Sequence, residues 1–159
     1  MGDDILSLVA PKADSRVAYG SDGNQFLELR MPSGKGPHPV AVCIHGGFWR
    51  AKYDLGYFGH LCAALTAKGV ATANVEYRRV GNPGGGWPGT FADIRAAYRF
   101  LIQNGKQYGF DARRVVVLGH SAGGQLALCL AAHETGLAGA ISLAATNPPK
   151  AFTRQSASY

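Results

Sequence analysis

The sequence predicts an α/β fold: a three-layer α/β/α sandwich around a mostly parallel sheet. Three observations predict it. Short apolar segments of strand length alternate with longer segments whose apolar residues recur at helical spacing. Several of the short segments are apolar throughout, as strands are when helices cover both faces of a parallel sheet. The chain has 159 residues, 47% of them hydrophobic, which suits one domain with a substantial core.

The first expected element is a hairpin near the N-terminus. Residues 25–31 alternate, with Leu27 and Leu29 on one face and Glu28 and Arg30 on the other. This period of two predicts a half-exposed strand. Residues 16–19 are its expected partner, because the Gly-Ser-Asp-Gly segment between them is typical of a turn.

Strands and helices alternate along the rest of the chain. We expect continuous apolar strands at residues 39–45, 70–77, 114–119 and 137–145, and helices at residues 55–68, 91–107 and 122–133. A loop rich in Gly and Pro fills residues 81–88. Ligands of such sheets bind where the parallel strands end, so functional residues are expected there.

Composition excludes several functions. The net charge of +6 is spread along the chain, with no basic run longer than a pair, which argues against nucleic-acid binding. No apolar run approaches the roughly 18 residues of a membrane span, and the N-terminus lacks a signal or myristoylation pattern. Cys43, Cys62 and Cys129 show no metal spacing, so we expect free thiols in the cytoplasm and no metal site.

Residues 119–123 read Gly-His-Ser-Ala-Gly, a G-x-S-x-G motif between an expected strand and an expected helix. That context is typical of a nucleophile elbow, in which a sharp turn projects the serine hydroxyl above the sheet. Ser121 is therefore the predicted catalytic nucleophile. His120 is not expected to be its base, because neighbouring side chains in so sharp a turn point apart.

A second motif, His45-Gly46-Gly47-Phe48-Trp49, directly follows the expected strand at residues 39–45. Glycines let backbone N–H groups approach a substrate oxygen closely, as an oxyanion hole requires. The N–H of the residue after the nucleophile, here Ala122, can supply another donor.

Together these motifs resemble the α/β-hydrolase superfamily, in its HGG-type esterase branch, and within it the kynurenine formamidase-like enzymes. Residues 45–49, 75–91 and 111–128 carry the resemblance. It implies Ser121 as nucleophile and Gly46, Gly47 and Ala122 as oxyanion-hole backbone. It implies hydrolysis of a carboxylic ester or small amide without a cofactor.

The expected substrate is a small neutral or aromatic ester or formamide. Phe48, Trp49 and Trp87 are aromatic residues expected at the strand-end face, where they would narrow an acyl pocket. His120 is assigned to the same pocket, and His45 is expected to support the oxyanion loop.

The triad acid and histidine of this family follow the nucleophile. After Ser121 the sequence offers only His133 and Glu134, about 18 Å along the expected helix and too far to act. We therefore expect residues 1–145 to be a truncated hydrolase domain, without its C-terminal strands, and residues 146–159 to be a disordered tail. Alone, such a chain would be weakly active or inactive, and its last strand would be an unpaired edge prone to self-association.

Two other functions fit parts of the sequence. A non-catalytic remnant or interaction module would keep the fold without the acid and base. A dinucleotide-binding domain would need a G-x-G-x-x-G turn. The turn after residues 39–45 instead carries Phe48 and Trp49, which would crowd a pyrophosphate.

Overall fold

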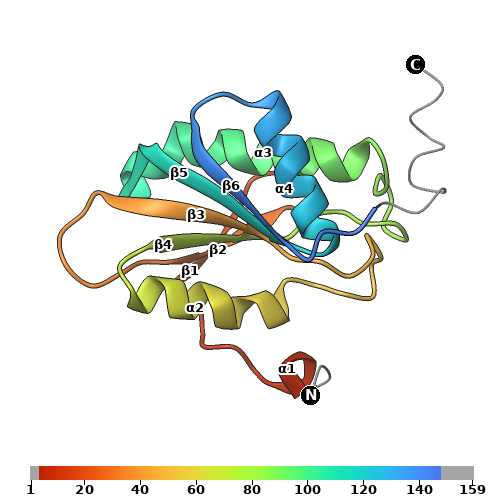
Figure 1. The fold of residues 1–159 in the computed structure, drawn as a ribbon, viewed down its shortest axis with the longest axis horizontal. Helices are drawn as coiled ribbons and strands as arrows, with labels where there is room; N and C mark the ends of the chain where they lie inside the picture. The colour runs from red at the N-terminus through yellow and green to blue at the C-terminus, as the bar shows by residue number, and fades with distance from the viewer. Residues whose placement is uncertain (1–3, 148–159) are drawn as a thin grey trace.

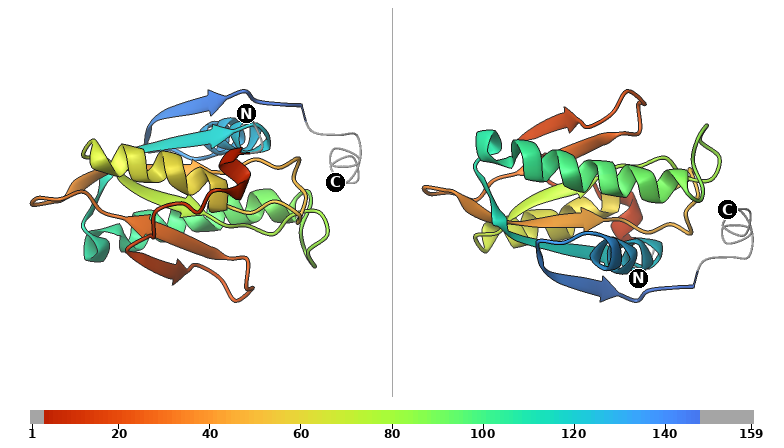
Figure 2. Two further views of the ribbon diagram at one scale, coloured as in Figure 1. Left: turned by 90° about the horizontal axis from the view of Figure 1, so that it is seen from below. Right: turned by 90° about the horizontal axis from the view of Figure 1, so that it is seen from above.

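The structure is a computed structural model in which residues 4–147 are described, and it confirms the α/β/α sandwich (Figure 1). One six-stranded sheet, in the order β1-β2-β4-β3-β5-β6, forms the middle layer. Strands β4, β3, β5 and β6 run parallel. At one side of them, β2 pairs antiparallel with β4, and β1 pairs antiparallel with β2. Helix α2 covers one face, and α3 and α4 cover the other (Figure 2).

The elements follow the expected order. The strands are β1 Ser15–Ala18, β2 Phe26–Arg30, β3 His38–Ile44, β4 Ala71–Val75, β5 Phe110–His120 and β6 Leu137–Leu143. The helices are α1 Asp4–Ser7, α2 Gly59–Ala67, α3 Gly89–Asn104 and α4 Ala122–His133, with 3-10 turns at Gly56–Phe58 and Gly105–Tyr108. Strand β5 begins four residues before the predicted position, because Phe110 already pairs with His38.

Strand β3 shows why the central strands are apolar throughout. Val42 and Ile44 pack into the core beneath α3 and α4, whereas Ala41 and Cys43 pack with α2. Successive side chains of a strand point to opposite faces, so a strand covered on both sides has no polar face.

Strand β2 follows its predicted alternation with one exception. Leu27 and Leu29 are buried, as predicted, but Arg30 is buried too and only 4% exposed. Its Nη2 donates to the Pro11 carbonyl at 2.7 Å. The segment before β1 therefore covers a face that the sequence pattern assigned to solvent.

Strand β6 lies at the edge of the sheet and pairs only with β5 among the described residues. This position agrees with the expectation that the last strand is an unpaired edge. Its continuous apolar pattern, however, does not reflect burial on both faces, because Ile141 is 48% exposed and Leu143 is 40% exposed. The expected tail lies mainly at residues 148–159, outside the described residues. Between residues 4 and 147, no helix is both long and apolar enough to cross a membrane.

Candidate active site

The two motifs lie beside each other at one edge of the sheet. Strands β3 and β5 are parallel neighbours, and Ile44 pairs with Gly119. The HGG segment therefore leaves β3 next to the point where the G-x-S-x-G segment leaves β5. This is the carboxyl edge at which open α/β sheets bind their ligands.

Ser121 has a backbone conformation that side chains rarely adopt. Its φ is 55° and its ψ is −118°, and α4 begins at the next residue. A serine before a helix normally caps it through its hydroxyl, but this hydroxyl makes no capping bond. The strained turn therefore leaves the hydroxyl free for another use, as in a nucleophile elbow.

The flanking glycines make this turn sterically possible. A Cβ at Gly119 would overlap the Gly123 carbonyl oxygen, and one at Gly123 would overlap the Ile44 carbonyl oxygen. A Cβ at Gly46 would lie 2.9 Å from the Ser121 Cβ. The HGG segment thus passes close to the serine, and only glycine permits the approach.

The HGG loop is itself strained. Gly47 has a φ of 119°, and Phe48 and Trp49, which are not glycine, have φ values of 54° and 58°. Two backbone hydrogen bonds hold the loop: Arg50 N–H donates to Gly47 O at 3.0 Å, and Val80 N–H donates to Trp49 O at 2.7 Å. Backbone held in sparsely populated conformations is common at functional sites.

The three predicted oxyanion donors are not equivalent. Gly46 N–H donates to the Tyr57 hydroxyl at 2.8 Å, so this predicted donor is already engaged. Within residues 4–147, Gly47 N–H and Ala122 N–H have no such acceptor. Ala122 is the first residue of α4, where helix N–H groups lack partners within the helix. Gly47 and Ala122 are therefore the available pair.

His120 points to Tyr57. Its Nδ1 lies 2.8 Å from the Tyr57 hydroxyl, and its ring packs beside those of Tyr57 and Phe58, with centroids 5.8 Å and 6.3 Å away. Burial raises the pKa of Tyr57, although the Gly46 N–H opposes the shift. The phenol therefore keeps its proton and can donate a hydrogen bond to the His120 Nδ1. Because this nitrogen faces Tyr57, His120 is not placed as the base of Ser121.

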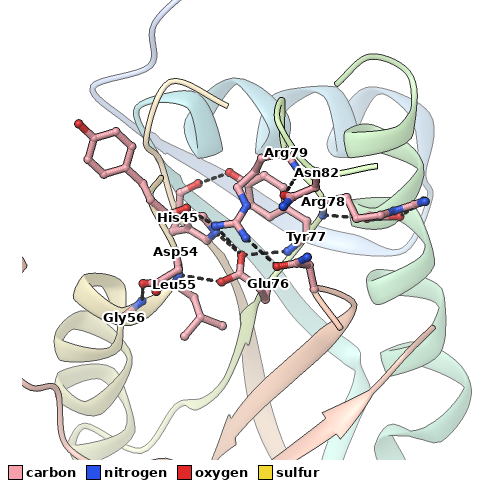
Figure 3. Close-up of polar contacts among 12 residues, drawn as sticks. His45, Asp54, Leu55, Gly56, Glu76, Tyr77, Arg78, Arg79 and Asn82 are labelled. Carbon is pink, nitrogen blue, oxygen red and sulfur yellow. Dashed lines mark hydrogen bonds and ion pairs between the residues drawn. The ribbon is translucent and has the colours of Figure 1, made fainter. Parts of the chain in front are cut away.

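Behind the loop lies a buried polar network in which His45, expected to support the loop, is joined by Glu76, a residue that was not predicted (Figure 3). His45 is 0% exposed and Glu76 is 3% exposed. The His45 Nε2 lies 2.8 Å from the Glu76 Oε1, and its Nδ1 lies 2.7 Å from the Gly46 carbonyl oxygen. One feature of the sequence could have indicated Glu76. This charged residue directly follows the apolar strand β4, which pairs with β3, the strand that leads into the HGG motif.

The three aromatic residues predicted to line the acyl pocket differ in placement. Phe48 is 60% exposed, whereas Trp49 is 1% exposed and belongs to the core. This burial contradicts a pocket-wall role for Trp49. Trp87 is partly buried and stacks on Phe91 with ring centroids 5.5 Å apart. Phe48 is therefore the one of these three rings most open to solvent.

No acid or histidine completes a triad among the described residues. All five histidines lie in the described part of the chain, and no hydrogen bond joins any of them to the Ser121 hydroxyl. The His133 Nδ1 lies 2.8 Å from the Cys129 carbonyl, at the far end of α4. Glu134 pairs with Arg95 at 2.7 Å. Residues 4–147 also contain no cluster of potential metal ligands.

A cavity of about 1100 Å³ lies beside this site rather than over the serine. The segment before β1, strand β2 and the loop after the HGG motif line it. Tyr57 and Glu76 belong to its wall, but Ser121 does not, nor do the four residues predicted to line the acyl pocket: Phe48, Trp49, Trp87 and His120. We therefore do not equate this cavity with the expected acyl pocket.

Comparisons with known proteins agree with this geometry. The BD-FAE family matches residues 27–151. Probable isoprenylcysteine alpha-carbonyl methylesterase ICMEL1 of Oryza sativa subsp. japonica is 30% identical over 119 residues, which are 74% of this chain and 27% of that protein. Versiconal hemiacetal acetate esterase of Dothistroma septosporum is 32% identical over 112 residues, which are 69% of this chain and 33% of that protein.

A solved structure shows the same likeness. The structure named Bacterial Heroin Esterase matches with a TM-score of 0.68 and 28% identity, over 86% of this chain and 45% of that chain. The chain thus spans about a quarter to a third of these curated relatives. The relatives and the solved structure are all named as esterases.

Proposed function

The chain belongs to the BD-FAE family of α/β-hydrolase esterases, and from this premise we propose that it is a serine hydrolase of carboxylic esters or small amides. Ser121 is the nucleophile, and the N–H groups of Gly47 and Ala122 form the oxyanion hole. The observation that carries the proposal is the strained Ser121 turn, with its hydroxyl free of a capping bond beside the HGG loop.

The proposed reaction is acyl transfer through Ser121. The Ser121 Oγ attacks the acyl carbon, a base takes the hydroxyl proton, and the carbonyl oxygen becomes an oxyanion. The bond to the leaving alcohol or amine then breaks, the leaving group takes up a proton, and water later releases the acid. Gly47 and Ala122 would stabilise the oxyanion, which is often the largest single contribution in such reactions.

The base is the part of this chemistry that the described residues do not supply. Loss of a triad histidine costs about 10⁶ in turnover in a well-studied serine protease, and binding with an oxyanion hole leaves a residual of about 10³–10⁴ over water. We therefore expect slow hydrolysis by this chain. The same observation favours the alternative, a non-catalytic module that keeps the hydrolase fold.

A serine-directed fluorophosphonate tests the proposal. Mass mapping should find the label on Ser121, and Ser121→Ala should abolish it, while Ser142→Ala, which removes another serine of the same sheet edge, should leave it unchanged. Labelling that survives Ser121→Ala would count against the assignment, and turnover at ordinary esterase rates would show that a base has been overlooked.

For the substrate we propose a small neutral or aromatic ester or formamide, as in a kynurenine formamidase-like enzyme. Exposed Phe48 supports it as a stacking surface, and the names of two relatives refer to a methyl ester and an acetate. A series of nitrophenyl esters with an aryl formamide tests the substrate, and a preference for long acyl chains would overturn it.

We also propose that the protein is located in the cytoplasm, because its three cysteines are free thiols.

A further inference from the structure

His45 is bonded at both ring nitrogens although its ring is completely buried. The Nδ1 lies 2.7 Å from the Gly46 carbonyl oxygen, and the Nε2 lies 2.8 Å from the Glu76 Oε1 (Figure 3). A carbonyl oxygen can only accept a hydrogen bond, so the Nδ1 must carry a proton. The state of the ring then depends on the single proton shared between the Nε2 and Glu76.

The surroundings of Glu76 place that proton on His45. Its carboxylate also accepts hydrogen bonds from the backbone N–H groups of Leu55 and Tyr77, each at 3.1 Å. The Arg79 Nη1 lies 3.3 Å from the same Oε1. These donors stabilise the ionised carboxylate, which can then accept a hydrogen bond from a protonated Nε2. With a proton on each nitrogen, the His45 ring would be an imidazolium.

The Tyr77 ring provides a suitable surface for such a cation. It stacks on the His45 ring with centroids 4.5 Å apart and an angle of 22°, and its hydroxyl donates to the His45 carbonyl at 2.8 Å. Burial raises the pKa of Tyr77, so the ring stays neutral and its face attracts a cation. Arg79 is the other cation beside Glu76, so an imidazolium at His45 would leave the cluster of these three residues with one excess positive charge.

We propose that His45, held by Glu76 as a buried imidazolium, polarises the Gly46–Gly47 peptide and thereby strengthens Gly47 N–H as the oxyanion donor. The inference rests on the proposed function, in which Gly47 is that donor. His45 and Glu76 are positioning residues, because they act through the peptide and contact no substrate.

The path from the charge to the donor is short. The imidazolium donates to the carbonyl of a peptide whose other end is Gly47 N–H. Hydrogen bonds linked in a chain polarise one another, by about 10–30% per bond. The bond from Gly46 N–H to Tyr57 fixes the preceding peptide, so the loop is held while Gly47 N–H stays without an acceptor among the described residues.

Nitrogen-15 NMR of the histidine rings tests the charge without any need for catalysis. In the wild-type chain, both ring nitrogens of His45 should carry a proton at neutral pH. A bare ring nitrogen on His45 at neutral pH would overturn the proposal. This measurement needs no variant, so a variant that fails to fold does not remove the test.

Glu76→Gln tests the coupling, because it keeps an acceptor oxygen and removes the charge. We expect His45 to become neutral, the Gly47 amide proton to move upfield, and fluorophosphonate labelling of Ser121 to slow by roughly tenfold, less than the loss of an oxyanion donor. Glu134→Gln, at a carboxylate bonded to Arg95, should change none of these. A neutral His45 with an unmoved Gly47 amide would contradict the proposal. Absence of labelling in the wild type would count against the proposed function instead, and the NMR readouts would still decide the inference.

Discussion

The HGG loop and the β6 edge lie on the same sheet but are stabilised differently. Behind the loop, both nitrogens of His45 and both carboxylate oxygens of Glu76 have partners, and the two residues are at most 3% exposed. At the edge, Ile141 and Leu143 face solvent, and within the described residues the buried hydroxyl of Ser142 has no partner. The HGG loop is therefore held from within the centre of the sheet, whereas the Ser121 turn also depends on the edge, because the Ser121 N–H donates to the Leu143 carbonyl oxygen at 2.8 Å.

Removal of Glu76 should have the largest effect on stability. Glu76→Ala leaves the buried Arg79 guanidinium and the buried His45 Nε2 without their carboxylate partner, which costs about 3–5 kcal/mol. Glu134, beside β6, pairs with Arg95 and Arg99, whose side chains are 35% and 56% exposed. Glu134→Ala should therefore cost less than about 1 kcal/mol. Urea denaturation of both variants measures the difference, and equal losses would mean that the two regions are held alike.

One substitution made in both regions should have the next largest effect. Gly123→Ala forces a Cβ into the Ile44 carbonyl oxygen and should destabilise the fold by about 2–3 kcal/mol. At Gly139, in β6, the nearest atom to an added Cβ is the Val116 Cγ1 at 4.0 Å. Gly139→Ala should therefore change stability by less than about 1 kcal/mol. Thermal unfolding of both variants compares them directly, and a tolerant Gly123 would contradict the packing described at the elbow.

The exposed edge should promote self-association. We propose that β6 pairs with β6 of a second copy, because its outer backbone groups and its exposed Ile141 and Leu143 are open to another strand. Light scattering after size exclusion should detect oligomers of the wild type, which the double variant Ile141→Lys, Leu143→Lys should reduce to monomers. Leu128→Lys, at an apolar residue of α4 that is 50% exposed, serves as the control. A monodisperse wild-type monomer would contradict this prediction.

The smallest expected effect is at the opposite end of β5, far from the serine. Hydrogen bonds from Arg113, with a further bond from Arg114, lower the pKa of Asp111 from 3.8 to about 2. At pH values above the pKa of Asp111 in the unfolded chain, about 4, this depressed pKa stabilises the fold. The contribution is lost as the pH falls from about 4 to about 2. Asp111→Asn should remove this pH dependence without changing labelling of Ser121, and an NMR titration midpoint near 4 for Asp111 would contradict it.

Much of the fold followed from local patterns in the sequence. The continuous apolar segments predicted β3, β4 and β5, and the helical spacing predicted α2, α3 and α4, because both patterns reflect burial within one segment. The burial of Arg30 was missed, because it depends on the segment around Pro11 that folds back over β2. The edge position of β6 was expected, but the exposure of Ile141 and Leu143 was missed, because it depends on which distant elements cover that face of the strand.

The candidate site was predictable in its backbone and less so in its side chains. Glycine spacing located Ser121, Gly47 and Ala122, since sharp turns need glycine at fixed positions. The engagement of Gly46 by Tyr57 and the pairing of His45 with Glu76 join residues 11 and 31 positions apart. Such contacts arise only when the strands are assembled, so no local pattern predicted them.

The structure of the Ser121 phosphonyl adduct is the most direct test of the central claim, that the elbow and the HGG loop form one site. We predict that the phosphonyl oxygen accepts hydrogen bonds from Gly47 N–H and Ala122 N–H at about 2.7–3.1 Å, while Gly46 N–H stays bonded to Tyr57. An adduct on another residue, or a phosphonyl oxygen that contacts neither amide, would contradict the account.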